Sequence, residues 1–175
     1  MKNAPLKFPL HIPFVEELGF ELWAFADGKS ELRVDLAEAH LNSWEVAHGG
    51  VLMTMLDVAM AHAARSVHIG AANYGPGIAT IEMKTSFVRA AEGRLRATGH
   101  LLHKTHTLAF CEGSLFNHDG ELCAHSTGTF KYLRALPAGS RRTKALQIVA
   151  PALAMPVAVP AAAIGEPSIT TTREP

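Results

Sequence analysis

The chain has 175 residues, which suits one domain with a hydrophobic core of its own. Lysine plus arginine and aspartate plus glutamate each number 16, so the formal net charge is zero and no basic excess points to nucleic acid or an anionic membrane as partner. No run of ~18 uninterrupted apolar residues occurs and the N-terminus lacks the apolar stretch of a secretion signal, so we expect a cytoplasmic protein without a membrane span.

The first part of the chain predicts a short helix followed by a hairpin. Residues 11–18 lie between a proline and a glycine and suit a short helix. Residues 20–26 and 31–36 suit two strands, because the Asp27-Gly28 pair between them favours a tight turn.

Residues 50–66 predict one long helix, since they contain no proline and are rich in leucine, methionine and alanine. Apolar side chains recur almost all round this helix: Val51, Leu52, Met53, Met55, Leu56, Val58 and Met60. That distribution is typical of a helix surrounded by protein.

Four strands of alternating polarity are predicted after the helix, over residues 78–88, 94–104, 108–117 and 121–133. In the first, alternation places Thr80, Glu82, Lys84 and Ser86 on one face and Ala79, Ile81, Met83 and Phe87 on the other. Strands this close in sequence pair antiparallel, so we expect a four-strand meander. One apolar helix and one long sheet are best buried if the sheet curls around the helix, which predicts an α+β fold.

The composition changes after Leu133. Residues 135–175 contain six of the ten prolines and are dense in alanine, which favours a partly extended tail over a second domain. The predicted organisation is one domain over residues 1–134 and a C-terminal tail over residues 135–175.

The helix is preceded by His48-Gly49-Gly50. Glycine lets a backbone approach a ligand closely, and the first turn of a helix presents unpaired N–H groups at the positive end of its dipole. Such a site binds a developing oxyanion. The alternative is that the glycines only let a loop turn tightly into the helix.

Asp57 lies inside the same helix. A carboxylate can act as a nucleophile or as a general base on water. The alternative is a solvated helix face, because Thr54, His62 and Arg65 lie broadly on the same side. Gly49 and Asp57 are eight residues apart, or ~12 Å along a helix. The two cannot act on one carbonyl within one chain, so a site that uses both must be shared between subunits.

These residues resemble the hot-dog-fold acyl-CoA thioesterases, in particular the PaaI-like (phenylacetate-degradation) branch of the 4-hydroxybenzoyl-CoA thioesterase superfamily. The matching pattern is Asn42, then His48-Gly49-Gly50, then Asp57. The run "ATIEMKTSFVRAAEGRLRATGHLLHKTHTLAFCEGSLFNHDGELCAHSTGTF" is similar to the last four strands of that family. The resemblance covers about residues 10 to 133 and implies a hot-dog fold, a curled sheet wrapped around one central helix.

The resemblance also implies a role for each matching residue. The Gly49 N–H would polarise a thioester carbonyl, and Asp57 of the partner subunit would attack that carbonyl or activate water. Asn42 would position the thioester or the water, and His48 would shape the loop. Thr80 matches a position where the family often carries a hydroxyl that holds the water.

Acyl-CoA is the substrate that the resemblance implies, with no cofactor and with a homodimer or a dimer-of-dimers tetramer as the assembly. Candidate contacts of the acyl thioester are Trp44, Gly50, Val51 and Met55. Candidate contacts of the CoA phosphates are Arg89, Arg94 and Lys104. The alternative for each of these three basic residues is a solvated surface charge. Glu45 stands where the family usually has glycine, and the turn at residues 104–106 lacks the family's usual Gly-Arg pair.

Cysteines and histidines give weaker signals. Cys111 and Cys123 lie in neighbouring predicted strands, which permits a disulfide, but we favour buried reduced thiols because no secretion signal accompanies them. His100, His103 and His106 do not share one face of a strand and have no completing ligands nearby, so we expect no metal site.

Two other functions fit the same fold. An enoyl-thioester hydratase or dehydratase would use His48 beside the carboxylate, and its product would be a hydroxyacyl thioester instead of a free thiol. A non-catalytic acyl-CoA-binding protein would bind without turnover.

Overall fold

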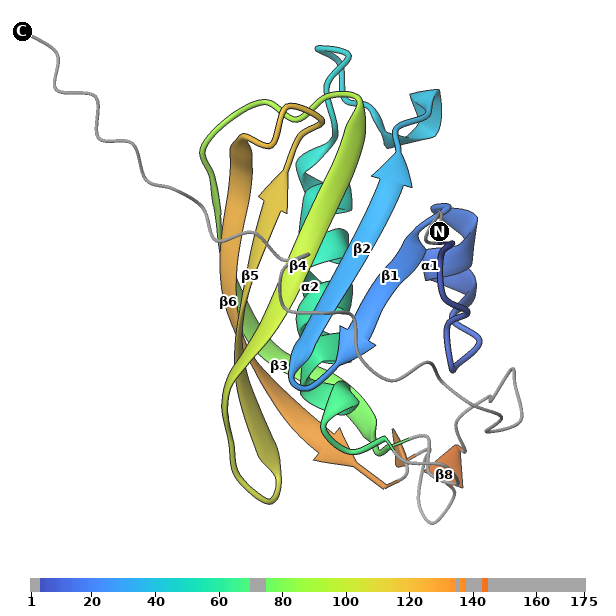
Figure 1. The fold of residues 1–175 in the computed structure, drawn as a ribbon, viewed down its shortest axis with the longest axis vertical. Coiled ribbons are helices and arrows are strands. Elements are labelled where there is room, and N and C mark those ends of the chain that lie inside the picture. The colour runs from blue at the N-terminus through green and yellow to red at the C-terminus, as the bar shows by residue number, and fades with distance from the viewer. Residues whose placement is uncertain (1–3, 70–74, 135, 138–142, 145–175) are drawn as a thin grey trace, which may run out of the picture.

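The computed structural model describes residues 4–69, 75–134, 136–137 and 143–144. In chain order the elements are α1 (Pro13–Glu17), β1 (Glu21–Ala26), β2 (Lys29–Asp35), a 3-10 helix (Glu38–His40), α2 (Gly49–Ser66), β3 (Gly77–Phe87), β4 (Arg94–Lys104), β5 (Leu108–Phe116) and β6 (Leu122–Leu133) (Figure 1). The predicted helices and strands are confirmed, with ends that differ by at most two residues.

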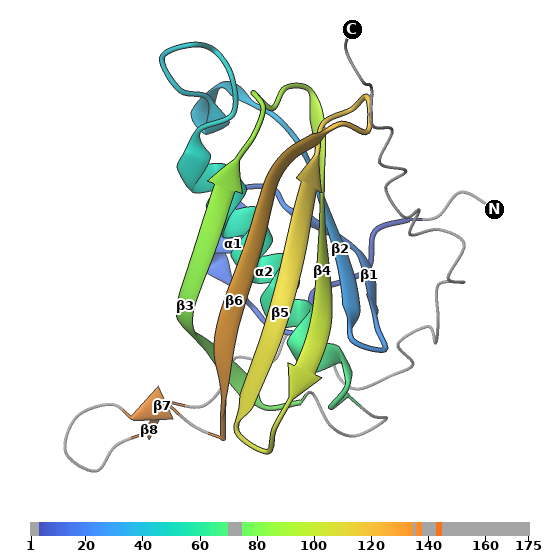
Figure 2. The same ribbon diagram turned by 90° about the vertical axis from the view of Figure 1, so that its left-hand side faces the viewer.

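The six strands form one antiparallel sheet in the order β1-β2-β4-β5-β6-β3. The sheet curls around α2, which lies against its concave side (Figures 1 and 2). The expected α+β hot-dog fold is therefore confirmed.

The prediction of a four-strand meander is wrong for β3. Only β4, β5 and β6 form a meander, whereas β3 pairs with β6 and not with its sequence neighbour β4. Strand β4 is fully paired between β2 and β5, with its helix-facing side chains buried. The helix-facing side of β3 is only partly buried, which suits the end of a sheet. Residues 88–93 cross the sheet from one strand to the other (Figure 2).

The helix packs very closely on the middle of the sheet. A Cβ at Gly99 would lie 2.4 Å from the carbonyl oxygen of Ala59, which is helix backbone. That carbonyl also accepts a hydrogen bond of 2.6 Å from the hydroxyl of Ser30 on β2. Gly113 and Gly128, on the next two strands, lie under the side chain of Met60. Glycine thus sets the distance between α2 and the sheet.

We expect Gly99→Ala to lower the free energy of unfolding by about 2–4 kcal/mol, because the new methyl group meets helix backbone that cannot rotate away. The measurement is chemical denaturation followed by circular dichroism. Gly120→Ala is a control for adding a methyl group where nothing lies within 4 Å, although its positive φ adds a small cost of its own. A loss at Gly99 no larger than the loss at Gly120 would contradict this account of the packing.

Three polar residues of α2 are buried: His62, Arg65 and Ser66. His62 is buried between Phe8 and Phe25, both of which meet its ring edge-on, and its Nδ1 lies 2.8 Å from the carbonyl oxygen of Val58. Burial, with a smaller effect of the Arg65 charge, lowers the pKa of His62 to about 4. His62 and Arg65 therefore do not form a solvated helix face with Asp57.

Most of the predicted tail lies outside the described residues. Its described part is a two-stranded pair, β7 (Leu136–Pro137) with β8 (Thr143–Lys144). Cys111 and Cys123 are free and buried, as expected. Among the described residues, no helix is long and apolar enough to cross a membrane.

Candidate active site

The loop before α2 is fixed by backbone hydrogen bonds. The N–H of Ala47 donates to Ala91 at 2.9 Å, and the N–H of His48 donates to the carbonyl of His40 at 2.8 Å. These bonds tie the start of the helix to the connection between β3 and β4 and to the 3-10 helix. The backbone at Gly49 is thus held from two sides.

Asn42 and Glu45 shape the tight turn of this loop. The Asn42 side chain accepts a hydrogen bond from the N–H of Trp44 at 2.8 Å, so in this chain it is a turn-forming residue. Glu45 adopts a φ of 59°, in the left-handed region that favours glycine. The backbone therefore keeps the conformation that the family's usual glycine would allow. Trp44 lies beside this turn with 81 % of its surface exposed.

His48 caps the helix and leaves one amide group free. Its Nδ1 accepts a hydrogen bond from the N–H of Gly50 at 2.9 Å, which uses one unpaired group of the first turn. The N–H of Gly49 makes no hydrogen bond within the described residues. At this end of α2 the helix dipole adds positive potential. The Gly49 N–H is therefore available to a carbonyl oxygen of a bound molecule.

Asp57 and Thr80 come together although they are 23 residues apart in sequence. The Thr80 hydroxyl donates to Oδ1 of Asp57 at 2.6 Å. Partial burial raises the pKa of Asp57 above its ordinary value, and the hydrogen bond from Thr80 offsets part of that rise. A partly desolvated carboxylate that remains reachable from solvent suits a base or a nucleophile.

A β-bulge in β3 points Thr80 toward the helix. The register of β3 against β6 shifts between Thr80 and Glu82, so Ile81 is an extra residue. Thr80 is opposite the buried Phe130, whereas Glu82 is opposite Thr129 and hydrogen-bonded to its hydroxyl on the outer face. Simple alternation had placed Thr80 and Glu82 on one face, and that prediction is wrong because the bulge reverses the alternation between them.

The structure keeps Gly49 and Asp57 apart within one chain. Both lie on the unbroken helix α2, with a separation of ~12 Å along its axis. Within one chain the Gly49 N–H and the Asp57–Thr80 pair are therefore two separate features.

The other residues that we predicted to contact the substrate do not lie together in one chain. Val51 and Met55 are buried in the core of the chain, packed toward the sheet. Gly50 is exposed beside His48 at the start of α2. Arg89 follows the end of β3, whereas Lys104 ends β4. Because these two strands run in opposite directions within the sheet, the two side chains lie toward opposite ends of it.

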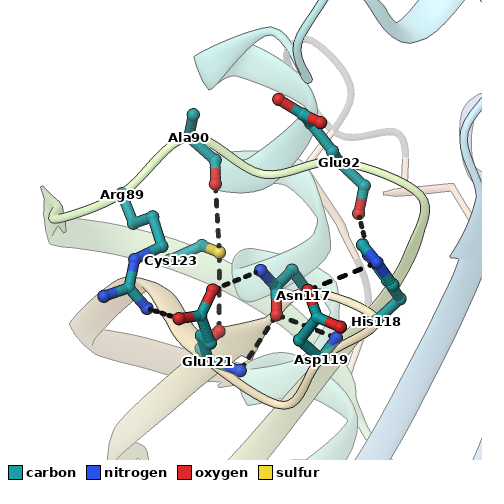
Figure 3. A network of polar contacts seen from close by, with 8 residues as sticks. All are labelled: Arg89, Ala90, Glu92, Asn117, His118, Asp119, Glu121 and Cys123. Carbon is teal, nitrogen blue, oxygen red and sulfur yellow. Dashed lines mark hydrogen bonds and ion pairs between the residues drawn. The ribbon is translucent and has the colours of Figure 1, made fainter.

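Arg89 has a partner within its own chain. Its guanidinium makes an ion pair of 2.9 Å with Glu121 of the β5–β6 hairpin (Figure 3). In the same network the Cys123 thiol donates to the carbonyl of Ala90, and Asn117 closes the hairpin turn (Figure 3). Arg89 thus holds the β3–β4 connection on the hairpin, at the end of the molecule where α2 begins.

Phe87 is a neighbour of the site that sequence reasoning did not single out. A Cβ at Gly49 would lie 3.5 Å from two atoms of the Phe87 ring, so the ring borders the free N–H. The ring remains half-exposed. The alternation of β3 placed Phe87 on one face but did not show which part of the helix that face would meet.

Comparisons with known proteins bear on the fold and the family of the chain. The family model of the thioesterase superfamily matches residues 45–124, which include Gly49, Asp57 and Thr80. A conserved protein of Pseudomonas aeruginosa, PA5202, is similar with 29 % identity and a TM-score of 0.65, over 71 % of this chain and 97 % of that one. No curated protein matches the sequence.

Two PaaI proteins share the fold. PaaI from the phenylacetic acid degradation operon of E. coli has 20 % identity and a TM-score of 0.62, over 69 % of this chain and 83 % of that one. A mutant of the phenylacetic acid degradation protein PaaI from Thermus thermophilus has 23 % identity and a TM-score of 0.61, over 70 % of this chain and all of that one. The predicted resemblance to the PaaI branch is thereby confirmed at the level of the fold.

Proposed function

Because the chain is a hot-dog-fold relative of the thioesterase superfamily, we propose that it hydrolyses acyl-CoA thioesters to a carboxylic acid and free CoA. The observation that carries this proposal is the Asp57–Thr80 pair, a partly buried carboxylate whose pKa is raised and whose orientation is fixed by one hydroxyl. The free N–H of Gly49 at the start of α2 supplies the second group that the reaction needs.

The reaction uses one half-site from each of two subunits. The Gly49 N–H of one subunit donates a hydrogen bond to the thioester oxygen, and the negative charge that develops there is stabilised by the amide and the helix dipole. The partner's Asp57 accepts a proton from water while the water oxygen bonds to the carbonyl carbon. The C–S bond then breaks, and the thiolate takes up a proton to leave as the free thiol.

The hydrogen bonds of the site favour hydrolysis over hydration of an enoyl thioester. A hydratase would need His48 as a proton carrier, but here the Nδ1 of His48 is occupied as the acceptor for the Gly50 N–H. The single carboxylate of the Asp57–Thr80 pair is sufficient for attack on a thioester.

The test is a thiol-release assay across acyl-CoA substrates with short, long and aromatic acyl groups. We expect free CoA to appear in proportion to the carboxylic acid formed, with no added metal or cofactor. A hydroxyacyl-CoA product from an enoyl-CoA substrate would point to the hydratase, and tight acyl-CoA binding without turnover would point to a binding protein.

A further inference from the structure

The β3–β4 connection, residues 88–93, is in direct contact with the loop that presents the Gly49 N–H. The carbonyl of Ala91 accepts a hydrogen bond of 2.9 Å from the N–H of Ala47, two residues before Gly49. Phe87, which ends β3 just before the connection, borders Gly49 with its ring. The position of the Gly49 N–H therefore depends on the position of this connection.

Polar contacts, and not apolar packing, hold the connection in place. Among residues 88–93, all of which the structure describes, only Ala91 is buried. On the side of the β5–β6 hairpin, the Cys123 carbonyl accepts the N–H groups of Val88 at 2.8 Å and of Arg89 at 3.2 Å. The Cys123 thiol donates to the carbonyl of Ala90 at 3.4 Å (Figure 3). A segment with so little buried surface moves easily when a polar contact is lost.

Glu121 connects the hairpin turn to the side chain of Arg89. Its Oε1 makes the ion pair of 2.9 Å with the Arg89 guanidinium, and its Oε2 accepts a hydrogen bond of 2.9 Å from the Asn117 amide (Figure 3). Asn117 in turn accepts the N–H of Glu121 at 2.9 Å. The carboxylate is thus fixed within its own hairpin and holds Arg89 from there.

We propose that Glu121 is a positioning residue for the reaction: through Arg89 it fixes the β3–β4 connection, and the connection fixes the Gly49 N–H. The inference rests on the proposed function, because it concerns the group that stabilises the thioester oxygen. It adds a residue that lies on the hairpin and acts through the backbone of the connection. It also gives Arg89 a structural role in place of a contact with CoA phosphates.

The charges around Arg89 do not suit a phosphate. Arg89 shares its network with three carboxylates, those of Glu92, Asp119 and Glu121 (Figure 3). A phosphate that approached the guanidinium would compete with the Glu121 carboxylate, which already lies 2.9 Å away, and would be repelled by the other two. The network therefore favours the role in positioning.

The expected effect of Glu121 is modest. The side chains of Arg89 and Glu121 are 49 % and 47 % exposed, so their ion pair is screened by solvent, and the backbone bonds to Cys123 remain without it. We expect Glu121→Ala to lower kcat by roughly threefold to fivefold. KM should not change, because a displaced N–H weakens stabilisation of the transition state and leaves the rest of substrate binding intact.

The first test compares an acyl-CoA with the corresponding acyl-pantetheine, which lacks the nucleotide and its phosphates. The fall in kcat should be the same for both substrates. Glu21→Ala is the matched control and should leave kcat unchanged. Its carboxylate also pairs with an arginine, Arg94 at 2.8 Å, and accepts one side-chain N–H, that of Trp23 at 2.8 Å, but it lies on β1 at the other end of the sheet.

A change of KM for acyl-CoA alone would overturn the inference, because it would show that this pair acts on the nucleotide. An equal loss of kcat in Glu21→Ala would overturn it too, since any exposed ion pair would then have the same effect. Exchanging the two charges gives a further test. Arg89→Glu should lower kcat, and adding Glu121→Arg should recover it, because the ion pair forms again with its charges reversed. No recovery would contradict a role for the pair.

A second readout does not depend on activity. The Ala47 N–H is protected by its bond to Ala91, so its hydrogen exchange, measured by NMR, reports whether the loop is still held. Exchange should be roughly threefold to fivefold faster in Glu121→Ala and unchanged in Glu21→Ala. Faster exchange in a protein that hydrolyses no thioester would refute the proposed function and leave the contact between Glu121 and the loop standing. Unchanged exchange and unchanged kcat in an active enzyme would overturn the inference and leave the proposed function standing.

Discussion

Asp57→Asn should lower kcat/KM for thioester hydrolysis by at least ~10²-fold, because an amide cannot attack the carbonyl or take a proton from water. The change is nearly isosteric, and the amide oxygen can still accept the Thr80 hydroxyl. Asp27→Asn is a matched control: this residue has a φ of 50° in the β1–β2 turn, where asparagine is tolerated, and we expect unchanged activity.

The variant should stay folded. Burial raises the pKa of Asp57 in the folded state, so the protonated carboxyl group favours folding below its unfolded pKa, and that contribution is lost as pH rises through the folded pKa. At neutral pH the neutral amide should therefore cost no stability, which thermal unfolding would measure. Activity near that of the unsubstituted protein, in a folded variant, would show that Asp57 is a structural residue.

The same raised pKa predicts the pH profile. Activity that needs the ionised carboxylate falls as pH decreases through the pKa of Asp57, so the acid limb should lie above the ordinary aspartate value of 3.8. Thr80→Val removes the hydrogen bond that lowers this pKa, so the acid limb should shift to higher pH in that variant.

Gly49→Pro should lower kcat by ~10²–10³-fold, because it deletes the N–H that stabilises the thioester oxygen. Proline is favoured at the first position of a helix, and among the residues that the structure describes this N–H has no hydrogen-bond acceptor. His48, with φ −63° and ψ 135°, already has the extended backbone that a residue before proline requires. The helix should therefore form normally.

Gly49→Ala separates the two properties of the glycine. It keeps the N–H and adds a methyl group at ordinary contact distance, 3.5 Å, from the Phe87 ring. We expect most of the activity to remain in this variant. Equal losses with alanine and proline would mean that space beside Phe87 matters and the N–H does not.

Mixing the two inactive variants tests whether the site is shared. A mixed dimer of Asp57→Asn and Gly49→Pro chains has one site with both groups intact and one with neither. Random reassociation makes half of the dimers mixed, so about a quarter of the original activity should return. No recovery after proven subunit exchange would count against a shared site.

The sequence by itself determined the helices and strands and predicted the candidate site residues. Strict alternation and the Asp27-Gly28 turn specify strands and a hairpin, and the apolar, proline-free stretch after Gly49 specifies a buried helix, because these signals depend on residues close in the chain. The 3.6-residue period alone separates Gly49 from Asp57 by ~12 Å and so predicts a divided site.

Only the tertiary structure decided which strands are neighbours and where side chains point. The place of β3 beside β6 depends on burial across the whole sheet, so the short connection to β4 misled the prediction. The bulge at Ile81 turns Thr80 inward to Asp57, and one inserted residue leaves no mark in an alternating pattern. Likewise, the approach of Phe87 to Gly49 and of α2 to Gly99 results from packing between segments far apart in sequence, which no local pattern encodes.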